Sequence, residues 1–302
     1  MVQAHSFISG NLVKGSKLQK NFSPVDGSEA SQVSLLSQTQ LSSVFKKAKK
    51  INIDKVLAND ELSRLAKYFK QHRQKFIEQI IWDAGFIQKD AEDLVDGSIE
   101  FCSDYHKNFA EIKNPEVITS FSFKHNRNQK ISLTSTPYGV ISATTPRNTP
   151  LITELTIIVH SLWSGNALVL RPSPGVAGTV ALLIDGLKKC FSSETLDRLN
   201  ITFSDAKDFI GISLNHANLL HYVGSTKYLE GTLIAGIKKG VKVLVDGDGC
   251  SLVLVDKTAN VDEAAKTCYQ GLIRCNAQIC ISVRVIVVEK SIYEQFRSKF
   301  LS

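Results

Sequence analysis

The sequence predicts an α/β protein whose core is a parallel sheet covered by helices on both faces. Two observations predict this class. From residue 137 onward, short apolar runs such as 167–170 alternate with longer segments in which apolar residues recur at helical spacing. Runs with almost no polar residue are typical of strands buried on both faces, and their alternation with helices is the pattern of parallel sheets. In such folds ligands bind at the carboxyl ends of the strands.

The composition indicates an ordinary globular protein. Of the 302 residues, 43% are hydrophobic and 22% are charged, and 36 basic against 29 acidic side chains give a net charge of +7. The basic residues are scattered and do not alternate with aromatic ones, which disfavours nucleic-acid binding. The N-terminus has no apolar signal-peptide core, and the most apolar stretch, 151–170, contains Glu154 and His160. We therefore expect a soluble, cytoplasmic protein that binds neither nucleic acid nor a membrane.

Six cysteines are spread along the chain, none in a Cys-x-x-Cys pair and none at zinc-ligand spacing from a histidine. This spacing disfavours a metal site and favours free thiols in a reducing compartment. Three of them fall in helical patterns, where a buried small hydrophobe is the expected role: Cys102, Cys190 and Cys268.

The chain divides into three parts by its patterning. Residues 1–37 are polar and predict an irregular arm with one or two short strands. Residues 38–248 begin with helical spacing and continue, after a predicted hairpin over 117–135, as the alternating strands and helices. Residues 249–302 start a second α/β block.

Within these parts the periodicity predicts each element in order. The expected helices are 40–50, 60–83, 90–109, 151–164, 176–189, 226–236, 260–274 and 291–301. The expected strands are 117–123, 130–134, 138–143, 167–170, 200–203, 219–223, 242–245, 252–256 and 283–288.

Two segments at predicted strand ends carry polar groups in rigid loops. In 144–150, two prolines fix the backbone around Asn148, whose amide is either a hydrogen-bond donor in a site or a helix cap. In 165–174, Arg171 and Ser173 follow a buried strand, where they suit a phosphate or a ribose, or form an exposed loop.

Two further turns offer an anion site and a base. Gly224 and Ser225 end a strand before a helix, so backbone N–H groups can face an anion, although a short Gly-rich turn is by itself a weak signal. Asp246 ends the strand 242–245 before Gly247 and is either a general base or part of a solvated Asp-Gly turn. Downstream, Cys280 lies where a helical pattern gives way to a strand, so it is a candidate nucleophile or a structural residue.

In this order and spacing, the segments resemble the aldehyde dehydrogenase superfamily from about residue 38 to the end. The family's Thr-Pro-Trp-Asn-x-Pro loop is matched by 145–150, and its Gly-Asn-x-x-Val-x-Lys-Pro-Ser-Glu by 165–174. Its Gly-Ser-Thr is matched by 224–226, its Glu-Leu-Gly-Gly by 246–249 and its Asn-x-Gly-Gln-x-Cys by 275–280.

The resemblance implies a Rossmann-like nucleotide-binding domain over 38–248, followed by the start of a catalytic domain. It implies that Cys280 is the nucleophile, that Asn148 and the Cys280 N–H form an oxyanion hole, and that Asp246 is the base. It implies a small-molecule aldehyde as substrate and NAD or NADP as cofactor. The residues implied to line the cofactor site are Thr144, Thr145, Pro146, Arg147, Arg171, Ser173, Gly224, Ser225 and Gly247.

The sequence also departs from the family pattern. Asp246 replaces a glutamate, which retracts the carboxylate by roughly 1.5 Å. Pro174 replaces the ribose-binding glutamate and Arg171 the preceding lysine, so NADP is accommodated as well as NAD. Four other positions differ: Arg147 for tryptophan, Leu229 for glycine, Cys275 for asparagine and Ala277 for glycine.

Family members continue for roughly a further domain beyond the point where this sequence ends. The resemblance therefore implies a truncated catalytic domain over 249–302, which leaves strand edges and an apolar face uncovered. We expect the chain alone to be poorly stable or to aggregate. We expect it to associate with a complementing C-terminal polypeptide, or with a second copy through the 117–135 hairpin. The departures from the family pattern leave two alternative functions open. One is an inactive or split fragment that keeps nucleotide binding. The other is a CoA-acylating aldehyde dehydrogenase, since such relatives lack the glutamate base.

Overall fold

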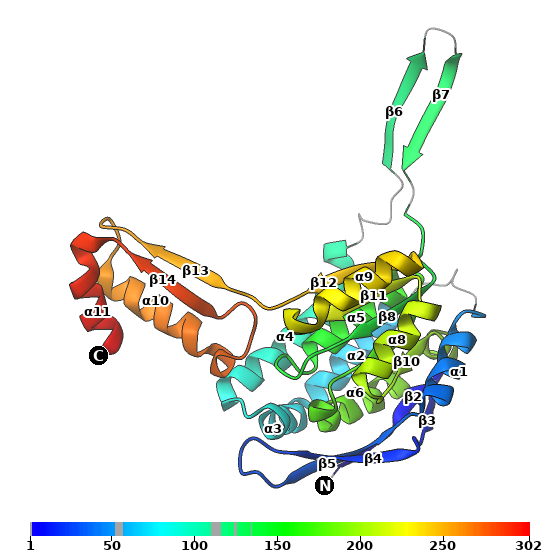
Figure 1. The fold of residues 1–302 in the computed structure, drawn as a ribbon, viewed down its shortest axis with the longest axis horizontal. Coiled ribbons are helices and arrows are strands. Elements are labelled where there is room, and N and C mark those ends of the chain that lie inside the picture. Colours follow the sequence, from blue (N-terminus) through cyan, green and yellow to red (C-terminus); the bar gives the residue numbers. More distant parts are fainter. Residues whose placement is uncertain (1, 52–56, 110–115, 124–125, 134) are drawn as a thin grey trace.

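The computed structural model describes residues 2–51, 57–109, 116–123, 126–133 and 135–302. Its centre is a seven-stranded sheet in the order β12-β11-β8-β9-β10-β2-β3 (Figure 1). The first five of these strands are parallel and the last two antiparallel, so the α/β fold predicted from the sequence is confirmed. The bounds are β12 Lys242–Asp246, β11 Leu219–Val223, β8 Val140–Thr144, β9 Ala167–Arg171, β10 Leu199–Ile201, β2 Ser6–Ile8 and β3 Asn11–Val13.

Helices cover both faces of this sheet because its central strands are apolar on both sides. In β9, Ala167 and Val169 pack with α1 and α8, whereas Leu168 and Leu170 belong to the larger core on the opposite face. This strict alternation is the period of two of a strand. One face is covered by α1 (Gln38–Ala48), α8 (Ala206–His216) and α9 (Leu229–Lys239), and the other by α2 (Asn59–Gln71), α3 (Arg73–Ala84), α4 (Gln88–Phe109), α5 (Ile152–Trp163) and α6 (Ala177–Cys190).

The N-terminal residues are more ordered than the sequence predicts, so the prediction of an irregular arm is wrong. They form five short strands, and two of these, β2 and β3, extend the main sheet through β10. The other three, β1 (Val2–Ala4), β4 (Lys17–Phe22) and β5 (Glu29–Leu35), form a separate sheet. The residues of β2 pair with residues 192 and 194 positions away along the chain, and β1, β2 and β3 have only 3 residues each. Local periodicity therefore carries little signal for these strands.

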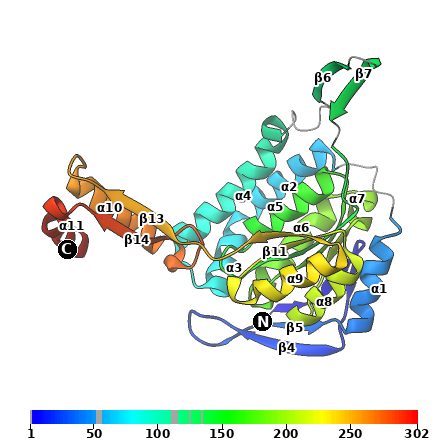
Figure 2. The same cartoon turned by 45° about the horizontal axis from the view of Figure 1, so that its top comes forward.

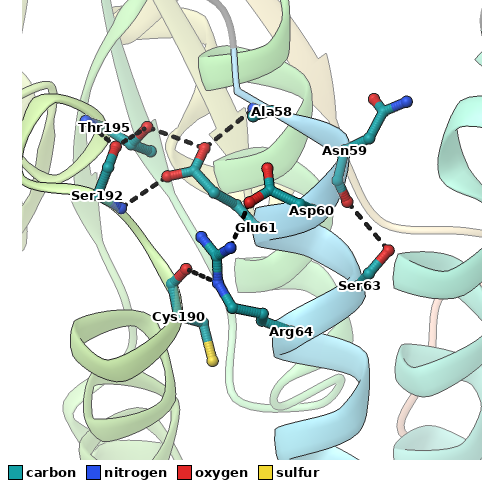
Figure 3. Close-up of polar contacts among 9 residues, drawn as sticks. All are labelled: Ala58, Asn59, Asp60, Glu61, Ser63, Arg64, Cys190, Ser192 and Thr195. Atoms are coloured by element: carbon teal, nitrogen blue, oxygen red, sulfur yellow. Dashed lines mark hydrogen bonds and ion pairs between the residues drawn. The ribbon is translucent and has the colours of Figure 1, made fainter.

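The buried carboxylate of Glu61, on α2, binds the residues that follow α6 (Figure 3). Glu61, which is 3% exposed, accepts hydrogen bonds from the backbone N–H of Ser192 at 2.6 Å and of Ala58 at 2.9 Å. It also accepts a bond from the hydroxyl of Thr195 at 3.1 Å, at the start of the short helix α7 (Ser193–Asp197). Because a buried carboxylate is costly without partners, these three donors fix α2 against α7.

Residues 249–302 form a small unit at one side of the main sheet, and the β6–β7 hairpin projects away from the body (Figures 1 and 2). The unit pairs β13 (Ser251–Val255) in parallel with β14 (Val283–Val288) and packs α10 (Val261–Ile273) and α11 (Tyr293–Leu301) on one face. The other face is exposed and apolar, with Leu252, Leu254, Val285 and Val287 between 39% and 73% exposed. The hairpin consists of β6 (Glu116–Phe123) and β7 (Asn126–Leu133).

The remaining differences from the predicted elements are local. The predicted helix 60–83 is two helices that meet at His72, and α7 and α8 have no predicted counterpart. Within the described residues, no helix combines the length and the apolar character needed to cross a membrane.

Candidate active site

One cavity of about 680 Å³ lies between the carboxyl ends of the main strands and the turn before β14. It brings together Asn148, Asp246 and Cys280, the three residues predicted to do the chemistry. Four residues of the predicted cofactor set also line it: Pro146, Gly224, Ser225 and Gly247. These seven residues come from four separate stretches of the chain, which the fold brings to a single edge of the sheet.

Asn148 lies in a rigid loop between β8 and α5. The backbone of Leu151 has φ 71° and ψ −63°, and the N–H of Ile152 bonds to the carbonyl of Pro150 at 3.0 Å. This is a strained γ-turn, a conformation that persists only where the surroundings enforce it. The Nδ2 of Asn148 donates to the carbonyl oxygen of Gln278 at 2.6 Å. Because an amide nitrogen carries two hydrogens, one of them is left for a ligand in the cavity.

Cys280 is exposed, and its backbone is held by a close contact with Gly249. A Cβ atom added to Gly249 would lie 1.8 Å from the carbonyl oxygen of Cys280, so only glycine fits there. The other cysteine of this stretch, Cys275, is buried, and burial, with a smaller contribution from Asp90, raises the pKa of its thiol to about 11. Since the thiolate is the reactive form, Cys275 is unsuited as a nucleophile and Cys280 is the accessible thiol of the pair.

The segment before Cys280 is strained and tied to the helical layer. Cys275, Asn276 and Ala277 all have left-handed backbones, with φ between 50° and 56°. The Cys275 N–H donates to Asp90 at 2.9 Å, and the Asn276 amide donates to the Gly85 carbonyl at 2.7 Å. The acceptors lie in the loop after α3 and in the first turn of α4, so these two places set the position from which the chain reaches Cys280.

Asp246 is 64% exposed at the end of β12 and is hydrogen-bonded to a histidine that the sequence analysis did not single out. Its Oδ2 lies 2.6 Å from Nε2 of His221, which is 19% exposed. In the parallel register His221 pairs with Leu244 and Val223 pairs with Asp246, so the two side chains share the α5 face of the sheet. The signal that could have found His221 is its place two residues before the end of a strand whose neighbour ends in Asp246.

The turn at Gly224 to Thr226, predicted to bind an anion, holds a carboxylate of the same chain, that of Asp248. The carboxylate of Asp248 accepts bonds from the Thr226 N–H, the Thr226 hydroxyl and the Ser225 hydroxyl, at 2.9, 2.7 and 3.2 Å. The Thr226 hydroxyl is the main cause that holds the pKa of Asp248 below its usual range. A phosphate that used this turn would have to displace Asp248.

A second cavity of about 840 Å³ lies between α8 and α9 on the opposite face of the sheet, and Thr144 and Arg171 of the predicted cofactor set line it. Arg171 donates to the carbonyl of Ser204 at 3.0 Å, and Lys207 and Tyr228 also line the cavity. Its size suits a nucleotide. Its apolar walls can hold the base, and its two cations, Arg171 and Lys207, can bind the phosphates. The residues present therefore fit the adenosine part of a nicotinamide dinucleotide.

Three residues of the predicted cofactor set line neither cavity. The hydroxyl of Thr145 is buried and donates to Glu154 at 2.5 Å. Arg147 donates from Nε and Nη2 to the carbonyl of Asp83, at 3.0 and 2.6 Å, which ties the loop to the end of α3. The Ser173 hydroxyl caps the short helix at Pro174–Val176 by accepting from the Gly175 N–H.

Comparison with known proteins identifies relatives that match most of the chain. The D-glyceraldehyde dehydrogenase (NADP(+)) of Thermoplasma acidophilum is 26% identical over 239 residues, which cover 79% of this chain and 47% of the relative. The lactaldehyde dehydrogenase of Methanocaldococcus jannaschii is 28% identical over 253 residues, covering 80% of this chain and 51% of the relative. This chain thus spans about half the length of these relatives.

Solved structures share the fold. A crystal structure of an E. coli NADP-dependent enzyme superimposes with a TM-score of 0.89 at 16% identity, covering 99% of this chain and 63% of that one. A lactaldehyde dehydrogenase structure gives a TM-score of 0.89 at 18% identity with the same coverage. The sequence model described as the aldehyde dehydrogenase family matches residues 13–302, and the chain therefore belongs to that family.

Proposed function

We propose that the protein takes part in the NAD(P)-dependent oxidation of an aldehyde to a carboxylic acid through a thioester on Cys280. The observation that supports this most directly is the single cavity lined by Asn148, Asp246 and Cys280. It combines an accessible thiol, an amide donor and a carboxylate, which are the groups that acyl chemistry on a cysteine needs.

In this proposal Cys280 attacks the aldehyde carbon as a thiolate and Asn148 donates to the oxygen that becomes negatively charged. The bond from Asn148 to the Gln278 carbonyl, two residues before Cys280, couples the donor to the nucleophile. A donor fixed in this way stabilises the developing charge without reorganising during the reaction. The bound dinucleotide would accept the hydride, and its adenosine part would lie in the cavity beside Arg171 and Thr144.

Names of relatives support the coarse substrate and cofactor classes. They include D-glyceraldehyde, lactaldehyde and vanillin dehydrogenases, and one of them is named for NADP(+). We propose an aldehyde as substrate and NAD or NADP as cofactor. The two cations of the second cavity, Arg171 and Lys207, support tolerance of the additional phosphate of NADP.

A CoA-acylating reaction is the second candidate. The hydrogen bond between Asp246 and His221 supports it, because this carboxylate is not free to activate water. An enzyme that transfers its acyl group to CoA does not need to activate water. An inactive fragment that binds nucleotide is the third, supported by Asp248 on the Gly224 turn.

One experiment separates these candidates. The protein is incubated with an aldehyde and NAD or NADP, with and without CoA, and the nicotinamide absorbance is followed. Turnover that needs no CoA supports the proposal, CoA-dependent turnover selects the second candidate, and nucleotide binding without turnover selects the third. Cys280→Ala should abolish turnover, whereas Cys250→Ala, which removes the other exposed thiol, should not. Full activity of Cys280→Ala would contradict both enzymatic candidates.

We also propose that a complementing C-terminal polypeptide covers the outer face of β13 and β14. Four exposed apolar side chains on that face support this, since apolar patches of this kind mark interaction surfaces. Association of two copies through the β6–β7 hairpin stays a prediction.

A further inference from the structure

His221 is a titratable group in the catalytic cavity that the family resemblance does not use. It lies on β11, one strand inward from Asp246, and lines the same cavity as Asn148 and Cys280. Among the described residues, Asp246 alone is hydrogen-bonded to its ring, through Nε2 at 2.6 Å. A ring that donates Nε2–H to a carboxylate carries its free lone pair on Nδ1.

Several charged or titratable groups line the two cavities that His221 lines. Asp246 comes from β12, His160 from α5, and Asp248, Cys280 and Arg284 from the loops and strand that complete the cavity. His160 is already bonded to the Tyr105 hydroxyl at 2.8 Å, and Arg284 to the Ala277 carbonyl at 2.8 Å. Asp248 is bonded to Thr226. The Asp246 carboxylate is therefore the one charged group in this set that bonds His221 directly.

We propose that His221 is the general base that activates water against the acyl group on Cys280, and that Asp246 orients the ring and stabilises its protonated form. This inference rests on the proposed thioester chemistry. It changes the role that the resemblance gives to Asp246, from base to positioning residue. The aspartate carboxylate ends one methylene short of a glutamate, and the imidazole bonded to it extends from the neighbouring strand of the same sheet face.

The hydrolytic step balances without any further reactant. Nδ1 of His221 takes a proton from water as the water oxygen forms a bond to the thioester carbon. The tetrahedral oxyanion accepts a hydrogen bond from Asn148. Its collapse breaks the C–S bond, releases the carboxylic acid and leaves Cys280 as a thiolate, while the proton on His221 passes to solvent. Imidazole suits this role because it can accept a proton from water and pass it on, as in other general bases.

The test uses an activated ester, p-nitrophenyl acetate, which acylates a thiol without any nicotinamide. In the full chain, a Cys280-dependent burst of nitrophenolate reports acylation, and the later steady rate reports release of the acetyl group. His221→Gln keeps an amide N–H that can reach Asp246 but cannot take a proton. We expect it to keep the burst and to slow the steady rate by about 10²-fold or more. His216→Gln, on α8 away from the cavity, is the matched control.

Asp246→Asn should slow the steady rate less than His221→Gln, and the double variant should be no slower than His221→Gln alone, because the two residues act as a unit. An unchanged steady rate in His221→Gln, or additive losses in the double variant, would overturn the inference. So would a wild-type chain without a Cys280-dependent burst. Aldehyde turnover is measured in parallel. If it is absent while the ester results hold, the proposed dehydrogenase function fails and the role of His221 stands.

Discussion

The carboxylate of Asp248 is bonded to Thr226 through both the backbone N–H and the hydroxyl, at 2.9 and 2.7 Å. A turn that lines the candidate active-site cavity through Gly224 and Ser225 is thus occupied by a carboxylate of the same protein. A ligand phosphate at this turn must compete with it, and the apparent affinity falls in proportion to the fraction of molecules in which the turn is free.

We therefore predict that Asp248→Ala tightens binding of NAD or NADP, by roughly tenfold. Fluorescence titration of the dinucleotide would measure the change. Asp93→Asn removes the same charge from the exposed face of α4 and serves as the control for net charge. Weaker or unchanged binding in Asp248→Ala would show that the carboxylate does not compete with the ligand.

Gly249→Ala should disable Cys280 without changing any chemical group in the cavity. The added methyl would lie 1.8 Å from the Cys280 carbonyl oxygen, so the backbone at Cys280 must move. A displacement of about 1 Å at a reacting group can cost on the order of 10²-fold in rate. The burst with p-nitrophenyl acetate measures this loss. Gly97→Ala on α4, where a Cβ meets nothing within 4 Å, should leave the burst intact, and an unchanged burst in Gly249→Ala would refute the prediction.

Ala277→Gly should stabilise the protein. Ala277 ends the run of three left-handed residues before Cys280, with φ 56°, and this backbone costs a residue with a Cβ about 1–2 kcal/mol. After allowance for the greater freedom of glycine in the unfolded chain, we expect a gain of about 1 kcal/mol, measured by urea unfolding. Ala264→Gly, inside the right-handed helix α10, should instead lower the free energy of unfolding. If both variants lose the same free energy of unfolding, the backbone at Ala277 is not strained.

The sequence predicted the central sheet well because its strands are continuous apolar runs between helices of clear periodicity. It could not predict β2 beside β10, since that pairing joins residues near 7 and near 200 and leaves no local pattern. In the site, the order of the motifs was enough to predict that Asn148, Asp246 and Cys280 lie in one cavity. It was not enough to show that Arg147 donates to Asp83 or that Asp246 is bonded to His221, because both contacts depend on side-chain directions set by tertiary packing.

The exposed face of β13 and β14 should make the isolated chain self-associate. Leu254 is 73% exposed and Leu252 53% exposed, and both lie on a short parallel sheet with open edges. Leu254→Lys should shift the protein toward monomer in sedimentation velocity without altering its helix content. Leu12→Lys, a 54% exposed leucine on β3, tests whether any added lysine has this effect. A chain that is already monomeric at high concentration would contradict the prediction.

Glu154 should make the stability of the protein depend on pH. Its side chain is fully buried in the first turn of α5, and burial raises its pKa from 4.5 to about 7, against the opposing effect of the bond from Thr145. Between these two pH values the folded state holds a proton that the unfolded state has lost. The free energy of unfolding therefore decreases as the pH rises through this window, by up to about 3 kcal/mol, and changes no further from this group above pH 7.

Glu154→Gln should remove this pH dependence. Compared with the wild type, the variant should be similar at pH 4.5 and more stable by up to about 3 kcal/mol at pH 8, as measured by urea unfolding across the range. Glu100→Gln, an exposed carboxyl on α4, is the matched control. If the wild type and Glu154→Gln give parallel curves, Glu154 does not carry a proton into the folded state.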